Sequence, residues 1–256
     1  MIVVNNSPEE KLFFNNIKYP DLKIIENTNK GYSHANNFGA GISKGEYLLF
    51  LNADTEIKSD FLMDLINNFK DMNFGAAGLK LFNPDNTFQL SFWKENNFLN
   101  EIENKKEEEK FREKDTEYIK NKERLYSDIK EVDWVSGAAI LIRKDIFNKT
   151  GGFDEEYFLF YEDADICKRL KDRGLKVYFY PGSNIIHYKG ENVNPAFQTD
   201  TYYFSKKSQL LYYKKHNNFV NKIMLRLYLF IKFSILYLMT FNKIYLRILK
   251  LTASVK

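Results

Sequence analysis

The chain has 256 residues, of which 44% are hydrophobic and 28% charged, enough for one substantial core or two small ones. This excludes a fibre and a disordered tail. The 38 basic and 34 acidic side chains give a net charge of +4, which does not require a nucleic-acid partner. The single cysteine, Cys167, excludes an internal disulfide and favours a reducing compartment. The residues after Met1 lack the pattern of a signal peptide, so export is not expected.

Short apolar runs alternate with helix-like segments over the first hundred residues, which is typical of parallel strands joined by crossover helices. Strands are predicted at Ile2–Val4, Leu22–Ile25 and Tyr47–Leu51, with a helical stretch after Pro8 between the first two. The third run is apolar on both faces, so it belongs in the middle of a sheet. The pattern predicts an α/β fold on an open, mostly parallel sheet.

Two helices are expected beside these strands. Ser33 can cap the first, whose small residues permit close approach to a sheet or a ligand. The second follows Asp60, and in it Phe61, Leu65 and Phe69 recur at i, i+4 and i+8. This spacing predicts an ordinary core-facing stripe.

Residues 101–133 differ in composition, with 12 acidic and 9 basic side chains in 33 positions. Pairs such as Glu101 with Lys105 have the spacing of salt bridges along a helix. We expect a solvated helical insertion. The alternative is a docking surface for a partner.

Strand and helix patterns resume after the insertion. Strands are predicted at Ala138–Ile142, Val177–Tyr180 and Ile185–Ile186, and a helix after Glu162. The chain is therefore divided into four parts: 1–100, 101–133, 134–216 and 217–256.

The last part, Phe219–Leu251, is rich in apolar side chains but is interrupted by basic ones. A membrane span needs about 20 nearly uninterrupted apolar residues, and Ile223–Phe241 contains Arg226 and Lys232. A basic amphipathic helix on an anionic membrane surface fits this pattern better. A docked C-terminal helix and a true span are the alternatives.

Polar residues follow the apolar third strand directly. Asn52 and Asp54 come at its carboxyl end, where open α/β sheets bind ligands. A carboxylate there suits Mg²⁺ or Mn²⁺ that also contacts a phosphate, although both residues equally suit a turn. His187 ends another predicted strand, and it is either structural or a further metal ligand beside Asp54.

Three acidic residues, Glu162, Asp163 and Asp165, stand at the start of the predicted helix, next to aromatic residues. Acids at a helix N-terminus can serve only to compensate the helix dipole. A carboxylate beside apolar walls can also act as a general base for a hydroxyl group.

Several motifs occur together in a characteristic order: Ile2–Ser7, Asn29–Asn37, Gly45–Thr55, Trp134–Ala138, Gly151–Glu155 and Tyr161–Asp165. In this order they resemble the family 2 glycosyltransferases of the GT-A fold, particularly the bacterial rhamnosyltransferase-like branch. The resemblance runs from Ile2 to about His216. The family usually has one more strand and helix ahead of the segment that Ile2 begins.

This resemblance implies inverting transfer of a sugar from a nucleotide-diphosphate donor to a saccharide or lipid-linked acceptor, in cell-surface polysaccharide synthesis. It implies that Asp54 and a divalent cation, Mg²⁺ or Mn²⁺, hold the diphosphate, with His187 as a second metal ligand. Asp163 would take the acceptor's proton, with Glu162 and Asp165 as the other catalytic candidates.

The resemblance also implies binding residues. The donor site would comprise Asn5, Asn29, Gly31, Asn36, Asn37, Asn52 and Asp54, and the acceptor site Trp134, Gly137 and Glu162. Asn5 stands where the family usually has an Asp that contacts the base, and its amide can hydrogen-bond a base. Together with the basic tail, the resemblance predicts a cytoplasmic protein that is peripheral at the inner face of the plasma membrane. The alternative is a non-catalytic scaffold that binds sugar nucleotides.

Overall fold

The computed structural model describes residues 1–7, 9, 21–113, 116–188 and 195–253. Its strands are β1 (Ile2–Asn5), β2 (Lys23–Glu26), β3 (Tyr47–Leu51), β4 (Thr55–Ile57), β5 (Phe74–Phe82), β6 (Phe88–Gln89), β7 (Phe92–Trp93), β8 (Lys130–Val132), β9 (Trp134–Val135), β10 (Ala139–Arg143) and β11 (Lys176–His187). Its helices are α1 (Tyr32–Ile42), α2 (Leu62–Phe69), α3 (Phe98–Arg112), α4 (Thr116–Leu125), α5 (Lys144–Thr150), α6 (Glu162–Lys171), α7 (Pro195–His216), α8 (Phe219–Thr240) and α9 (Lys243–Ala253). The helical stretch expected after Pro8 lies outside the described residues.

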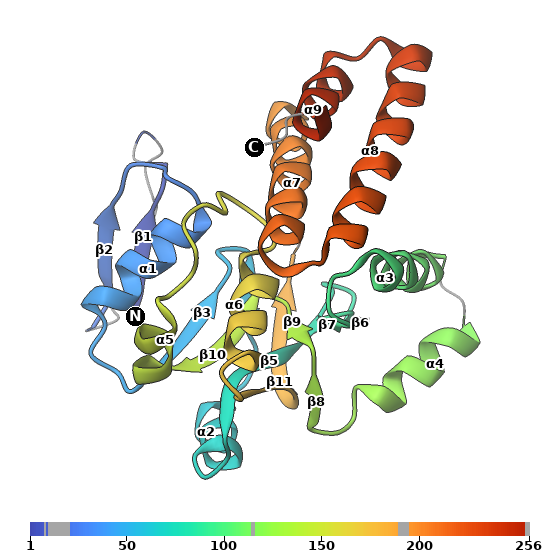
Figure 1. Cartoon of the computed structure of the whole chain (residues 1–256). Helices are drawn as coiled ribbons and strands as arrows, with labels where there is room; N and C mark the ends of the chain where they lie inside the picture. The colour runs from blue at the N-terminus through green and yellow to red at the C-terminus, as the bar shows by residue number, and fades with distance from the viewer. Residues whose placement is uncertain (8, 10–20, 114–115, 189–194, 254–256) are drawn as a thin grey trace.

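The main sheet has the strand order β3-β10-β5-β11-β4. β5 and β11 are parallel, and β10 runs antiparallel to both β3 and β5, so β3, β5 and β11 point in one direction. Helices α5 and α6 contribute to the core on one face and α2 to the core on the other (Figure 1). The open α/β sheet flanked by helices is therefore confirmed, as a mixed sheet.

Strand β5 lies at the centre of this sheet, although the sequence patterns predict no strand there. Its sequence, FGAAGLKLF, contains no β-branched residue and so lacks the usual strand signal. Packing requires the small residues, because a Cβ atom at Gly78 would lie 2.2 Å from the Cβ of Val135 in β9. A Cβ at Gly75 would lie 3.1 Å from the Cβ atoms of Leu170 and Leu175. The small residues of β5 are therefore required by its packing against β9, α6 and Leu175.

Strands β1 and β2 form a separate parallel two-stranded sheet, against which α1 packs. The prediction that Ser33 caps α1 is wrong, because the helix begins after Gly31 and Ser33 is buried within it. Gly31 has φ 102°, which favours glycine, and a Cβ atom there would lie 2.5 Å from the carbonyl oxygen of Phe158. This close approach brings the loop before α6 against the start of α1.

The strands predicted at Val177–Tyr180 and Ile185–Ile186 are a single strand, β11. Its pairing with β5 shifts register between Tyr180 and Ile185 and then continues, because β5 extends alongside it. In α2 the predicted stripe is confirmed, since Phe61, Leu65 and Phe69 are all buried.

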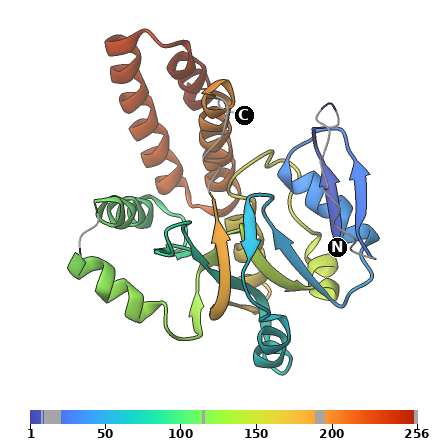
Figure 2. The same cartoon turned by 180° about the vertical axis from the view of Figure 1, so that it is seen from behind.

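Helices α7, α8 and α9 pack on one another and stand away from the sheet in both views (Figures 1 and 2). Leu225, Leu229 and Phe233 of α8 are buried in this packing. The tail forms two helices because Phe241 adopts a left-handed conformation, φ 50°, that ends α8. By length and composition α8 is apolar enough to cross a membrane, whereas the overlapping segment Ile223–Phe241 was predicted to be too interrupted by Arg226 and Lys232.

Candidate functional site

The polar residues after β3 meet the end of β11. Because both strands point in one direction, their carboxyl ends lie at the same edge of the sheet. The Nε2 atom of His187 lies 3.3 Å from Oδ1 of Asp54 and 3.4 Å from the amide nitrogen of Asn52. The backbone also joins them, since the Tyr188 N–H donates to the Asp54 carbonyl at 2.9 Å.

Gln89 in β6 fixes the orientation of His187. Its amide nitrogen donates to the His187 carbonyl at 2.6 Å, and its Oε1 lies 3.1 Å from the Nδ1 atom. The tautomer in which Nδ1 donates to Gln89 has its lone pair on Nε2, on the side of Asp54, where a cation could accept it. Gln89 is buried, and it was not predicted as a site residue, because a glutamine on a two-residue strand belongs to no recognisable motif.

The donor atoms at this edge fit a divalent cation. Two adjacent ligands of an octahedral ion lie about 3 Å apart when each bond is about 2.1 Å, close to the distance between Asp54 Oδ1 and His187 Nε2. Among the described residues, no group of three His, Cys, Asp or Glu side chains could hold an ion. A cation here would therefore need further oxygen ligands from outside these side chains.

Glu162 and Asp163 open helix α6 and form the second part of the site. The Gly137 N–H donates to Oδ2 of Asp163 at 2.9 Å, and the Ala164 N–H donates to Oδ1 at 2.8 Å. Glu162 is buried, and its Oε2 atom has no hydrogen-bond partner. The two carboxylates thus sit in unlike surroundings.

Burial raises the pKa of Glu162 well above its ordinary value, and the adjacent Asp163 charge raises it further. Burial also raises the pKa of Asp163, while the amide donors of Gly137 and Ala164 oppose this shift. Glu162, whose Oε2 has no hydrogen-bond partner, is therefore the member of the pair that more readily holds a proton, and the hydrogen-bonded Asp163 is the more readily ionised member.

Tyr32, the first residue of α1, links the two parts of the site. Its hydroxyl donates to the Gly137 carbonyl at 3.1 Å. Burial raises its pKa, and the charges of Glu162, Asp163 and Asp54 raise it further. Tyr32 was not predicted as a site residue, although it directly follows Gly31 in the motif Asn29–Asn37.

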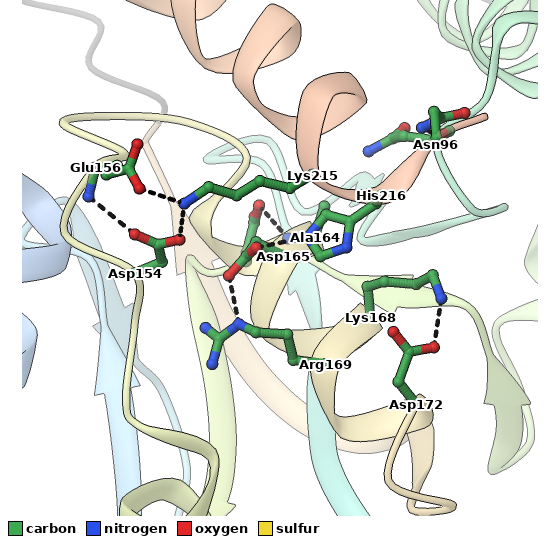
Figure 3. Close-up of polar contacts among 12 residues, drawn as sticks. Asn96, Asp154, Glu156, Ala164, Asp165, Lys168, Arg169, Asp172, Lys215 and His216 are labelled. Carbon is green, nitrogen blue, oxygen red and sulfur yellow. Dashed lines mark hydrogen bonds and ion pairs between the residues drawn. The ribbon is translucent and has the colours of Figure 1, made fainter. Parts of the chain in front are cut away.

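Asp165 is wholly buried, and its carboxylate lies between Arg169 and His216 (Figure 3). Its Oδ2 accepts from Nε of Arg169 at 2.7 Å, and its Oδ1 lies 2.7 Å from Nε2 of His216 at the end of α7. Arg169 also donates to the carbonyls of Thr150 and Gly152. Asp165 therefore joins α6 to α7 and, through Arg169, to the loop before Phe153.

Most of the candidate asparagines bind neighbouring protein groups. Asn5 donates to Glu26 at 2.8 Å, Asn29 accepts from the Gly31 N–H at 3.1 Å, and Asn36 donates to the Tyr32 carbonyl at 3.0 Å. Asn37 donates to the Phe153 carbonyl and accepts from the Phe153 N–H, both at 2.8 Å. These side chains fix the loops around the site.

Trp134 in β9 forms a wall near Gly137. Its ring stacks on Trp93 with centroids 4.4 Å apart and planes inclined by 20°, and its indole N–H donates to the Lys94 carbonyl at 2.8 Å. The stacking on Trp93 covers one face of the Trp134 ring.

A family model described as glycosyl transferase family 2 matches residues 1–151. The chain belongs to this family. A second model, described as the N-terminal domain of galactosyltransferase, matches residues 129–191. The two matches overlap and together span both parts of the site.

Relatives of this family 2 chain include rhamnosyltransferase WbbL of Escherichia coli, 28% identical over 216 residues, 76% of this chain and 74% of that protein. N-acetylglucosaminyl-diphospho-decaprenol L-rhamnosyltransferase of Mycobacterium tuberculosis is 37% identical over 70 residues, 27% of this chain and 23% of that protein. These names support the rhamnosyltransferase-like branch.

Among solved structures, GalNAc-T7 with UDP, GalNAc and Mn²⁺ is 14% identical, with a TM-score of 0.51 over 83% of this chain and 41% of that one. A mannosyltransferase from Pyrobaculum calidifontis with GDP-mannose and Mn²⁺ is 14% identical, with a TM-score of 0.50 over 78% of this chain and 49% of that one. The family 2 chain thus shares their fold and spans less than half of their length.

Proposed function

We propose that this family 2 protein transfers a sugar from a nucleotide-diphosphate donor to an acceptor hydroxyl, with inversion at the anomeric carbon. The main support is the placement of two functional groups around Tyr32. Asp54, which lies beside His187, and the Glu162–Asp163 pair both carry charges that raise the pKa of the buried Tyr32 phenol. Two groups of this kind suit a reaction in which one supports the departing diphosphate and the other receives the proton of the attacking hydroxyl.

In this reaction Asp163 takes the proton from the acceptor hydroxyl. The acceptor oxygen forms its bond to the anomeric carbon as the bond from that carbon to the diphosphate oxygen breaks. The nucleoside diphosphate departs with the electron pair of the broken bond. Glu162, which keeps its proton, contacts the acceptor as a hydrogen-bond donor.

Asp54 and His187 are the residues that would hold a divalent cation, with oxygens of the diphosphate completing its shell. A bound cation supplies positive charge against the departing diphosphate. Asn52 and Gln89 support this group, the first beside His187 Nε2 and the second at Nδ1. Asn5, Asn29, Gly31, Asn36 and Asn37 shape the donor side, and Trp134 and Gly137 the acceptor side.

Donor transfer tests this proposal directly. Purified protein is incubated with UDP-, dTDP- and GDP-sugars, a saccharide or lipid-linked acceptor, and Mn²⁺ or Mg²⁺. We expect turnover with at least one donor, loss of turnover with EDTA, and at least a tenfold loss on Asp54→Ala, since the diphosphate charge is then poorly neutralised. The exposed Asp71→Ala is the matched control.

Nucleotide binding without turnover from any donor would contradict the enzyme proposal and support a sugar-nucleotide scaffold. Calorimetric titration of Mn²⁺ in the presence of nucleoside diphosphate gives a second readout. Asp54→Ala should weaken Mn²⁺ binding, whereas Asp71→Ala should not.

We further propose that the tail holds the protein on the inner face of the plasma membrane, where a lipid-linked acceptor would be reached. Leu227, Ile231 and Leu238 form an exposed apolar stripe on α8. Residues 201–256 contain 11 lysines and arginines and no acidic residue, a charge that suits anionic lipids. Arg226 and Lys232 within α8 favour a helix lying in the interface over a helix crossing the bilayer.

Vesicle flotation tests the tail. The triple variant Leu227→Glu, Ile231→Glu and Leu238→Glu should lose at least nine-tenths of its binding to vesicles containing phosphatidylglycerol and keep transfer to a soluble acceptor. Point substitutions are better than truncation here, because α8 and α9 pack on α7. Ile57→Glu, Leu62→Glu and Met63→Glu form a matched control on another exposed apolar surface. Unchanged binding of the α8 variant would contradict the proposal, and resistance to alkaline carbonate extraction would indicate a span.

A further inference from the structure

The two residues before Glu162 have a strained backbone. Phe160 has φ 68° and Tyr161 has φ 67°, so two consecutive non-glycine residues adopt the left-handed conformation. This conformation is unfavourable for residues that carry a Cβ atom, and it persists only where surrounding contacts hold it. These contacts therefore set where the Glu162–Asp163 pair points.

The side chain of Tyr161 is held by a buried carboxylate from the charged insertion. Its hydroxyl donates to Oε1 of Glu101 in α3 at 2.9 Å. The other oxygen of Glu101 accepts from the Gln209 amide in α7, and Oε1 of Gln209 accepts from Lys206 at 3.1 Å. Glu101 is only 7% exposed, so the expectation of a fully solvated insertion does not hold at this residue.

Helix α7 holds the same loop on its other side. Ser208, the neighbour of Gln209, donates to the Leu159 carbonyl at 2.8 Å. The ring of Phe204 stacks on Phe158 with centroids 4.5 Å apart. The loop before α6 is therefore held from α3 and α7 at Phe158, Leu159 and Tyr161.

We propose that Glu101 and Gln209 are positioning residues, which hold Tyr161 and through it set the orientation of the Glu162–Asp163 pair toward the acceptor hydroxyl. This inference rests on the proposed function, because it assigns the pair its acid and base roles. In this proposal the charged insertion, through Glu101, and helix α7, through Gln209, both help to orient the groups that take part in sugar transfer.

A series of hydrogen bonds runs from Lys206 through Gln209 to Glu101, which also accepts from Tyr161. Tyr161 and Gln209 both donate to Glu101. This suits an ionised carboxylate, whose oxygens only accept hydrogen bonds. Burial raises the pKa of Glu101, and the hydrogen bonds from Tyr161 and Gln209 with the charges of Lys105 and Lys206 oppose that shift. Burial lowers the pKa of Lys206 to about 8, so its charge is retained at neutral pH.

Glu101→Leu tests the inference, because leucine fills a similar volume and leaves Tyr161 without its acceptor. We expect kcat to fall about tenfold, with donor KM and nucleoside-diphosphate Kd within twofold of wild type. Glu101→Gln keeps one acceptor oxygen and should recover kcat to within threefold. Tyr161→Phe should match Glu101→Leu, and combining the two should add little, because both remove one contact.

Glu103→Leu is the matched control on the same helix, since Glu103 is exposed and pairs only at the surface with Lys94. It should leave kcat unchanged. An unchanged kcat in folded Glu101→Leu would overturn the inference. So would a loss of kcat that is matched by an equal loss of nucleotide affinity.

Hydrogen exchange separates this inference from the proposed function. The Asp165 N–H donates to the Tyr161 carbonyl at 2.8 Å and reports the strained turn without any catalysis. Its exchange should be at least tenfold faster in Glu101→Leu and unchanged in Glu103→Leu. If wild type shows no turnover, faster exchange still supports the positioning role while the enzyme proposal fails. Unchanged exchange overturns the positioning role.

Discussion

Replacing Asp163 with asparagine should lower kcat for sugar transfer about 10²–10⁴-fold, which is the usual contribution of a general base. Asparagine keeps the side-chain size and an oxygen that accepts from the Gly137 or Ala164 N–H, so the fold of the α6 start is retained. The amide cannot take the acceptor's proton. Initial rates at saturating donor and acceptor measure the effect, and nucleotide affinity should stay within threefold.

The pH profile provides an independent check on Asp163. Burial raises its pKa above the ordinary aspartate value, and only the ionised form accepts a proton. Activity should therefore be present at high pH and fall as the pH drops through this raised pKa. Asp172→Asn, at the exposed end of the same helix, is the matched control and should keep both rate and profile. An Asp163→Asn enzyme with wild-type kcat would show that another group is the base.

Local patterns in the sequence were sufficient for several features of the fold and of the candidate site. The apolar strand Tyr47–Leu51 followed by Asn52 and Asp54 identified one edge of the sheet, and the acidic helix start identified Glu162 and Asp163. Each of these signals is contained within a few consecutive residues. Their approach to Tyr32 depends instead on the close packing of the loop before α6 against the start of α1.

Features that depend on long-range contact were not predictable in this way. Strand β5 is rich in glycine and alanine because α6 and β9 pack on it, and composition alone does not indicate a strand. Gln89 and Glu101 act on residues 98 and 60 positions away, respectively, and neither belongs to a recognisable motif. Asp165 belongs to the same motif as Asp163, but its carboxylate binds Arg169 and His216 and so joins α6 to α7.

Asp165→Asn should destabilise the fold by about 3 kcal/mol, which is typical when a buried ion pair loses one partner. Asp165 is wholly buried, and its carboxylate binds both Arg169 and His216 (Figure 3). The neutral amide leaves the Arg169 charge without its counter-ion, and it weakens the link between α6 and α7. For a chain of this size, a loss of that magnitude corresponds to a fall in Tm of about 6–12 °C.

Thermal and urea unfolding of Asp165→Asn measure this effect against Asp145→Asn. Asp145 pairs with Arg143 at 3.0 Å, but both side chains are exposed, so its loss should cost less than about 1 kcal/mol. At a temperature where both variants are folded, kcat of Asp165→Asn should stay within tenfold of wild type, because this carboxylate does not face the acceptor. A variant of wild-type stability with kcat reduced as far as in Asp163→Asn would instead make Asp165 a catalytic residue, and it would remove the distinction between the two carboxylates of this helix.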